Sequence, residues 1–364
     1  MELAKIIDNF EVNSEFESAV QLLAGHINVT QLVTLKNKEK YILQRMNKYV
    51  FKNPPELMEN IINVTKFIEE KYEKAGKDYT RYVLDFLLTR DGKYYFVDDE
   101  GEYWRCYHYI DNSDTYYAAD SEKILFETGK AFGMFQEQLS TFDASILHET
   151  IRDFHNTIQR YKNLKESARK DVMHRLEKVK DVYDEFISLE DEACKMSYML
   201  QRGELPLRVT HNDTKCNNVL IDNDTNEALA VIDLDTIMPG LAGFDFGDSI
   251  RSGAATAKED EKDTSLVKCD IEKFRAYARG FLLATSKSLT KLEIKTLALG
   301  AFNMTCECGV RFLTDYLDGD LYFHVTSEDQ NLIRAKNQLA LAKDILKKKT
   351  TLDAVIRDIT HHCI

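Results

Sequence analysis

Residues 209–222 read VTHNDTKCNNVLID, and this stretch decides how the rest of the chain is interpreted. A short apolar strand leads into a polar loop, and a second apolar strand follows it. Within the loop, Asn218 follows Asp213 five positions later, and Lys215 lies between them. A plain polar turn also contains such residues, because Asp and Asn are common in turns. The neighbouring sequence therefore has to distinguish a turn from a reactive site.

The next apolar strand also ends in acidic residues. Residues 230–235 read AVIDLD, so that Asp233 and Asp235 close the strand. Carboxylates at this place, shortly after an H-x-D-x-x-x-x-N loop, are typical of the magnesium site of a kinase. In that chemistry Asp213 accepts the proton of a substrate hydroxyl, and Lys215 stabilises the phosphoryl group. The predicted Mg²⁺ ligands are Asn218 and Asp233, with Asp235 as a further candidate.

A second acidic motif lies 12 residues after Asp233, where residues 245–247 read DFG. These letters spell the magnesium motif of protein kinases, but here they do not follow an apolar strand. We therefore assign the metal to Asp233 and expect Asp245, Asp248 and Arg251 to brace the catalytic loop. The activation-segment signature of protein kinases is also missing after Asp233, which disfavours a protein substrate.

The first part of the chain is predicted to form a strand-rich lobe. Strands are expected over Thr30–Leu35 and Lys40–Gln44, joined by a tight turn, and a helix is expected to begin at Pro54. Further strand-like runs cover 81–89, 93–98 and 103–110, with a hairpin signal at 91–92. This lobe is expected to bind the nucleotide.

The cation that would meet the nucleotide phosphates is not a lysine. The second strand carries Gln44 and Arg45, and strand alternation allows only one of them to face the site. Charge favours Arg45. Before the first predicted strand, a loop that contains Gly25 and Asn28 is expected to fold over the phosphates, although the Gly-rich pattern G-x-G-x-x-G is absent.

The rest of the chain is mainly helical in pattern. Helical spacing covers 123–139 and continues to residue 200, short β runs occupy 207–209, 219–221 and 229–232, and helices resume from 271. The predicted fold class is α+β, with two lobes like a protein kinase. The predicted domains are a nucleotide-binding lobe at 1–110 and a catalytic and substrate-binding lobe at 111–364, and a small-molecule site is expected in the cleft between lobes.

Composition limits the class of protein further. The chain has 364 residues with a net charge of −13, which argues against a nucleic-acid partner because phosphates attract basic surfaces. The seven Cys are odd in number and irregularly spaced, as in a reducing compartment. The sequence shows neither a transmembrane run nor a signal-peptide core. We expect a cytoplasmic protein with no membrane partner, as a monomer or a homodimer.

Further motifs carry a resemblance to a known family. They are YILQRMN at 41–47, FKNP at 51–54, Trp104-Arg105, RFLTDY at 311–316 and Tyr322-Phe323. With them the chain resembles the aminoglycoside-phosphotransferase and choline-kinase-like small-molecule kinases, and within that family the N-acetylhexosamine 1-kinases. The resemblance implies ATP and Mg²⁺ as cofactors and phosphate transfer to the anomeric hydroxyl of GlcNAc or GalNAc. It also implies that Arg311 and Tyr322 bind the sugar.

Two alternatives stay open at this stage. In the first alternative, the acceptor of the phosphoryl group is a different small alcohol, such as choline, homoserine or an aminoglycoside. A choline site would need an aromatic cage, and an aminoglycoside site would need clustered acids such as Asp315, Asp318 and Asp320. In the second alternative, the protein binds nucleotide without catalysing transfer, which the missing strand lysine allows.

Overall fold

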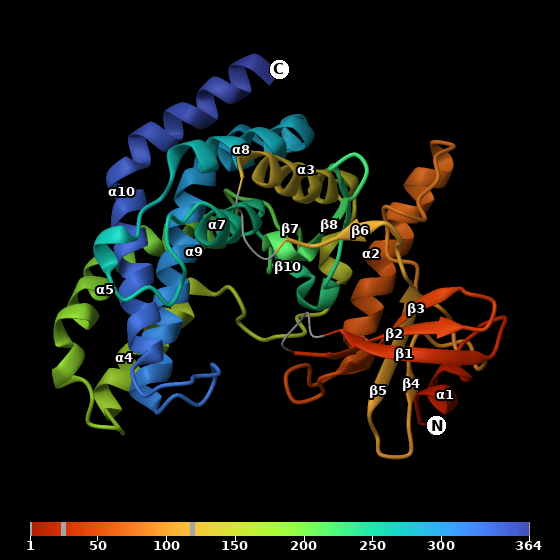
Figure 1. Cartoon of the computed structure of the whole chain (residues 1–364). Helices are drawn as coiled ribbons and strands as arrows, with labels where there is room; N and C mark the ends of the chain where they lie inside the picture. The colour runs from red at the N-terminus through yellow and green to blue at the C-terminus, as the bar shows by residue number, and fades with distance from the viewer. Residues whose placement is uncertain (1, 23–26, 117–120, 364) are drawn as a thin grey trace. The chain divides into compact units, whose positions relative to one another are not determined.

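The computed structural model describes residues 2–22, 27–116 and 121–363. For residues 362 and 363 only the backbone is described. Contacts within the chain group it into two compact units (Figure 1). Unit 1 comprises Met1–Asp114, Thr141–Arg152 and Leu220–Pro239, and unit 2 comprises Thr115–Ser140, Asp153–Val219 and Gly240–Ile364. The segment with Asp233 and Asp235 thus belongs to unit 1, and the loop with Asp213 belongs to unit 2.

Unit 1 is built on a five-stranded antiparallel sheet, with strand order β1-β2-β3-β5-β4. The strands are β1 (Phe16–Leu22), β2 (Val29–Leu35), β3 (Lys40–Met46), β4 (Phe96–Val97) and β5 (Tyr103–His108). A smaller sheet has the order β6-β8-β9, from β6 (Ser113–Asp114), β8 (Val219–Asp222) and β9 (Ala228–Val231). Two helices complete the unit, α1 (Glu2–Ile7) and α2 (Pro54–Lys74).

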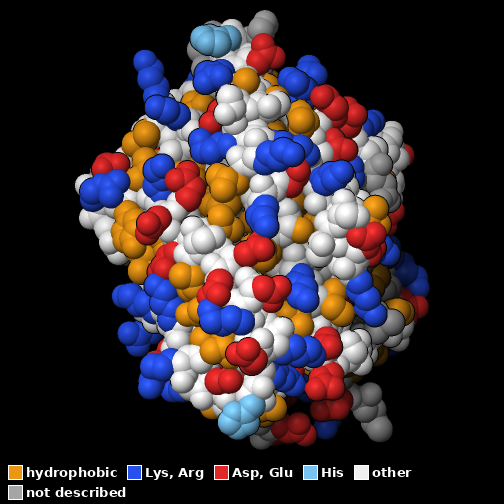
Figure 2. Space-filling view, turned by 90° about the vertical axis from the view of Figure 1, so that its left-hand side faces the viewer, with side chains coloured by type: hydrophobic (Ala, Val, Ile, Leu, Met, Phe, Trp, Pro, Cys, Tyr) orange, Lys and Arg blue, Asp and Glu red, His pale blue; other side chains and the backbone are white. Residues whose placement is uncertain are grey.

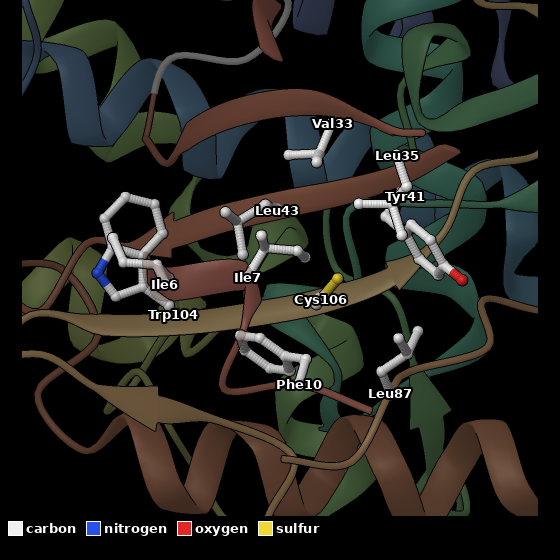
Figure 3. Packing of buried hydrophobic residues seen from close by; sticks show 10 residues of the cluster. All are labelled: Ile6, Ile7, Phe10, Val33, Leu35, Tyr41, Leu43, Leu87, Trp104 and Cys106. Carbon is white, nitrogen blue, oxygen red and sulfur yellow. The ribbon is translucent and has the colours of Figure 1, made fainter. Parts of the chain in front are cut away.

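One face of the five-stranded sheet is closed by the start of the chain. Ile6, Ile7 and Phe10 are buried against Leu43 of β3 and Trp104 of β5 (Figure 3). Because side chains alternate along a strand, the residues between these core positions point to the opposite face. Gln44 and Arg105 are therefore on that opposite face, directly across from each other in the β3–β5 register.

Unit 2 is mainly helical (Figure 1). Its helices are α3 (Glu122–Gln138), α4 (Thr157–Lys170), α5 (Lys180–Ala193), α6 (Lys195–Gln201), α7 (Ala242–Gly253), α8 (Ile271–Thr285), α9 (Lys291–Asp318) and α10 (Gln330–Cys363). Two short strands are β7 (Arg208–Thr210) and β10 (Met238–Gly240). Of β10, only Gly240 belongs to unit 2, because unit 1 includes the chain up to Pro239. A Cβ added at Gly247 would lie 2.3 Å from the carbonyl oxygen of Gly300, so α7 and α9 touch through glycines.

Most predicted elements are confirmed, and the fold class is the predicted one, an α+β protein-kinase-like fold. The strand predicted over 81–89 is wrong, because this stretch makes only isolated bridges such as Phe86 to Tyr107. The predicted strand over 93–98 is reduced to Phe96–Val97. β1 was not predicted, because its seven residues alternate poorly and none of them is fully buried.

Among the described helices, none combines the length and the apolar composition that crossing a lipid bilayer requires. On the face that Figure 2 shows, acidic and basic side chains are mixed, and neither sign forms a continuous patch. The described cysteines are free thiols, namely Cys106, Cys194, Cys216, Cys269, Cys306 and Cys308.

Candidate active site

The catalytic loop, residues 211–218, connects β7 to β8 and carries Asp213 in unit 2. The Asp213 side chain is 28% exposed, so its carboxylate reaches solvent. Lys215 Nζ lies 2.7 Å from Asp213 Oδ1, and Asn218 Nδ2 donates to Asp213 Oδ2 at 3.1 Å. The loop therefore brings together the three residues that the sequence predicted for this side of the site.

Two electrostatic details bear on what these residues do. Burial opposes the charge of Lys215, but the carboxylates of Asp213 and Asp248 raise its pKa above the ordinary value, so Lys215 is a cation at neutral pH. The Asn218 amide donates through Nδ2 to the Asp213 side chain and carbonyl oxygen. Within the described residues its Oδ1 accepts no hydrogen bond, and an amide oxygen is a donor type that Mg²⁺ uses.

Asp245 holds the start of the loop. Its carboxylate is fully buried and accepts the backbone N–H groups of His211 at 2.9 Å and of Asn212 at 2.8 Å. Gln136 of α3 donates to the same carboxylate at 2.7 Å. Burial raises the pKa of Asp245, while the hydrogen bonds from the loop oppose this rise. The expectation that Asp245 braces the catalytic loop is confirmed.

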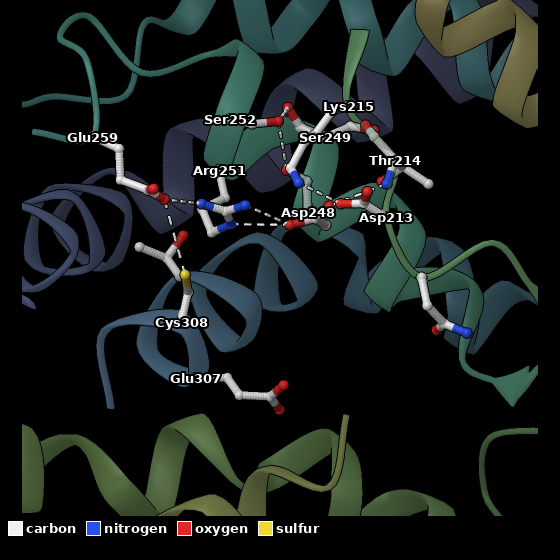
Figure 4. Close-up of polar contacts among 12 residues, drawn as sticks. Asp213, Thr214, Lys215, Asp248, Ser249, Arg251, Ser252, Glu259, Glu307 and Cys308 are labelled. Carbon is white, nitrogen blue, oxygen red and sulfur yellow. Dashed lines mark hydrogen bonds and ion pairs between the residues drawn. The ribbon is translucent and has the colours of Figure 1, made fainter. Parts of the chain in front are cut away.

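Asp248 and Arg251, also on α7, hold the middle of the loop (Figure 4). Asp248 Oδ2 accepts the Thr214 backbone N–H at 3.1 Å, and its Oδ1 accepts Arg251 Nε at 2.9 Å. Arg251 also binds Glu259 at 2.7 Å. Although burial works in the opposite direction, the charge of Arg251 lowers the pKa of Asp248. The carboxylate therefore stays ionised and keeps its hold on the loop.

In unit 1, Asp233 and Asp235 follow β9 as the sequence indicates. Asp233 adopts a left-handed backbone with φ 58°, a conformation that Asp tolerates better than most residues. Asp235 is buried, and its carboxylate pairs with Arg105 and accepts a hydrogen bond from Asn28. Both carboxylate oxygens of Asp235 therefore have protein partners.

Arg105 is the functional candidate that the sequence analysis did not assign. It is only 2% exposed, it pairs with Asp235, and its Nε donates to Gln44 Oε1 at 2.9 Å. Arg45 points to the other face of the sheet, where its charge acts on Asp98. The placement therefore favours Gln44 and Arg105 over Arg45 as the residues beside the acids. The signal that could have found Arg105 is its cross-strand register with Gln44.

The predicted phosphate loop is described only in part. Gly25 lies outside the described residues. Asn28 is described, and its amide connects two segments, because Oδ1 accepts the Asn47 backbone N–H at 3.0 Å while Nδ2 donates to Asp235. The end of this loop is thereby fixed next to the acids of unit 1.

Arg311 and Tyr322, the predicted sugar residues, lie together in unit 2. Arg311 Nη2 is 3.5 Å from the Tyr322 hydroxyl. The guanidinium carbon is 5.7 Å from the Tyr322 ring centre and 5.4 Å from the ring centres of Phe154 and Phe323. We call these four residues the Arg311 cluster. The Tyr322 side is exposed, so the cluster is accessible to a ligand.

No group of three or more His, Cys, Asp or Glu side chains in the described ranges is arranged to hold an ion. Asn218 in unit 2 and Asp233 in unit 1 each carry a side-chain oxygen of the kind that Mg²⁺ binds.

Fold and loop geometry together define a phosphotransferase of the protein-kinase-like class. Residues 18–268 match the phosphotransferase enzyme family, and the chain belongs to this family. Similar solved structures include an aminoglycoside phosphotransferase from Alicyclobacillus acidocaldarius, with 11% identity, a TM-score of 0.59, and coverage of 98% of this chain and 96% of that one.

Two further solved structures are similar in fold. An amicoumacin kinase in complex with AMP-PNP, Ca²⁺ and Ami has 13% identity and a TM-score of 0.60, covering 96% of this chain and 93% of its own. A choline kinase from Cryptosporidium parvum has 15% identity and a TM-score of 0.55, covering 98% and 97%. At these identities the likeness concerns the fold alone, and the acceptors of the three proteins differ.

Proposed function

We propose that this protein is an ATP-dependent kinase that phosphorylates the anomeric hydroxyl of an N-acetylhexosamine. The observation that carries the choice of acceptor is the Arg311 cluster, in which three aromatic rings surround a guanidinium. Ring faces that already hold a cation leave no cage for a quaternary ammonium, and the fixed charge repels one. Donors and a partly exposed ring suit neutral hydroxyl and acetamido groups.

Two of the three acids that would attract an aminoglycoside have other roles. Asp315 is buried and accepts the backbone N–H groups of Tyr322 at 2.8 Å and of Phe323 at 3.0 Å. Asp320 pairs with Arg175 at 2.7 Å. Two of the three acids thus hold the loop that carries Tyr322, which supports a neutral acceptor over a polycation.

In the proposed reaction, Asp213 orients the acceptor hydroxyl and takes its proton as the oxygen attacks the γ-phosphorus of ATP. Lys215 stabilises the charge that builds up on the phosphoryl oxygens. Asn218 and Asp233 are the proposed ligands of Mg²⁺, which neutralises phosphate charge when it is bound. The pair of Gln44 and Arg105 is the proposed polar lining next to the phosphates.

The test is nucleotide consumption with Mg²⁺-ATP against GlcNAc, GalNAc, glucose, galactose, choline, homoserine and kanamycin. We expect an acid-labile sugar 1-phosphate from the N-acetylhexosamines and none from choline or kanamycin. Turnover with choline or kanamycin instead would reject the proposed acceptor and leave the kinase assignment in place. ATP binding without turnover of any acceptor would favour a protein that binds nucleotide only.

A further inference from the structure

A buried histidine contacts the catalytic loop and is paired with a buried glutamate. His155 immediately precedes Asn156, the N-cap residue of α4. Glu307 lies on α9 and is labelled in Figure 4. His155 Nδ1 is 2.7 Å from Glu307 Oε1, and the two side chains are 8% and 1% exposed. His155 Nε2 is 3.1 Å from the backbone carbonyl oxygen of Asn212.

These two contacts bear on the hydrogens that His155 carries. A carboxylate oxygen and a carbonyl oxygen both accept hydrogen bonds and donate none. With Glu307 ionised, both contacts are hydrogen bonds only when each ring nitrogen of His155 carries a hydrogen. Glu307 is the matching anion, because the charge and hydrogen bond of His155 lower its pKa despite a burial that raises it. The second oxygen of Glu307 accepts the Thr157 hydroxyl at 2.6 Å.

Other groups near His155 are compatible with this charge. The carboxylate of Asp248 on α7 interacts with it electrostatically, and the cation Arg160 on α4 acts on Glu307. The rings of Phe154 and Phe244 pack against the imidazole, with centroids 4.5 and 5.8 Å away. Two acids thus interact electrostatically with His155, and two aromatic rings pack against it.

The residue that His155 holds is in a demanding conformation. Asn212 has φ 65°, in the left-handed region, and directly precedes Asp213. Such a conformation is retained where its surroundings fix it. Asp245 binds the N–H of Asn212, and His155 binds its C=O, so the peptide groups on both sides of its α-carbon are held.

We propose that His155 and Glu307 are positioning residues that act as a charged pair: the imidazolium binds the Asn212 carbonyl oxygen and fixes the turn that orients Asp213. This inference rests on the proposed role of Asp213 as the base. Neither residue of the pair is required to touch a substrate. Loss of the pair is therefore expected to change the rate of transfer rather than the binding of ATP.

The first test compares His155→Gln with His148→Gln. His148 pairs with Glu59 at 2.9 Å in unit 1, so its variant removes a similar pair from the unit that does not contain the catalytic loop. We expect kcat of His155→Gln to fall about 10- to 100-fold, as for a misplaced catalytic group, with KM for ATP nearly unchanged. His148→Gln should keep the wild-type kcat. If a folded His155→Gln variant had the same kcat as the wild type, the proposal would be overturned.

The second test does not depend on turnover. Long-range ¹H–¹⁵N NMR of the wild-type protein should show both ring nitrogens of His155 protonated at neutral pH, and Glu307→Gln should remove that signature. A single protonated nitrogen in the wild type would overturn the proposal, and it would do so even if no variant folds. Absence of turnover with every acceptor in wild type would instead reject the proposed function, while the NMR result still decides the charged pair.

Discussion

The acids of the two units differ in how far the side chain is exposed to solvent and in the partners that the carboxylate has. Asp213 in unit 2 is 28% exposed and has one cation, Lys215, whose side chain is itself 44% exposed. Asp235 in unit 1 is 4% exposed and is paired with the equally buried Arg105. An acid with solvent on one side can exchange a proton with a substrate, whereas a buried acid with two partners fixes a structure. Exposure and partners, rather than residue type, thus separate reaction from support.

The largest effect is expected for Asp213→Asn. The amide keeps the size of the side chain but neither accepts the substrate proton nor pairs with Lys215, so we expect kcat to fall about 10²- to 10⁴-fold. Because Asp213 is partly exposed, the melting temperature should change little. Steady-state kinetics with thermal unfolding on the same sample measures both. Turnover close to wild type would remove Asp213 from the reaction.

Arg105→Met probes the buried pair, with Arg45→Met as its control on the opposite face of the same sheet. Asp235 would lose the charged partner of a buried ion pair, which destabilises proteins by about 3–5 kcal/mol. We also expect a higher KM for ATP in any folded fraction. Arg45→Met should leave KM for ATP unchanged. The reverse pattern, with ATP binding lost only in Arg45→Met, would restore Arg45 as the phosphate residue. Urea unfolding and nucleotide titration provide the two readouts.

Arg311→Met is expected to act on the acceptor alone. Loss of hydrogen bonds from a charged donor, worth about 1.5–3 kcal/mol, would raise KM for the N-acetylhexosamine about tenfold or more. KM for ATP should remain as in wild type, since Arg311 lies in unit 2 and outside residues 1–110, the lobe that is expected to bind the nucleotide. A new activity toward choline in this variant would support the view that the guanidinium excludes cations. An unchanged KM for the sugar would separate Arg311 from the acceptor.

The smallest effect concerns Asp222, a purely structural acid at the end of β8. A backbone hydrogen bond from Thr225 and the guanidinium of Arg81 lower its pKa to about 2. The unfolded value is about 3.9, so the contribution to stability is complete above that pH and disappears as pH falls toward 2. Wild type and Asp222→Asn should therefore differ in melting temperature at pH 6 and converge near pH 2. A constant difference across this range would contradict the assignment.

Local sequence was sufficient for several elements. The helix after Pro54 and the helix from 122 to 138 follow from prolines, caps and apolar spacing, which act within a few residues. The H-x-D-x-x-x-x-N spacing located the loop whose side chains do contact one another. The stretch 81–89 misled the prediction because its apolar residues are buried in an irregular segment. Burial alone does not require a strand.

The sequence by itself determined the family, the α+β class and the identity of Asp213, Lys215 and Asn218 as neighbours, because these depend on spacing along one short loop. The expectation that Asp245 braces this loop also came from the sequence. The tertiary structure added His155, which contacts the loop, and Glu307, which contacts His155, because no local pattern encodes contacts across 57 and 152 positions. The choice between Gln44 and Arg45 likewise needed the sheet. Side-chain alternation predicts that Gln44 and Arg45 point to opposite faces of the sheet. Only the packing of α1 and β5 decides which of these faces is buried in the core.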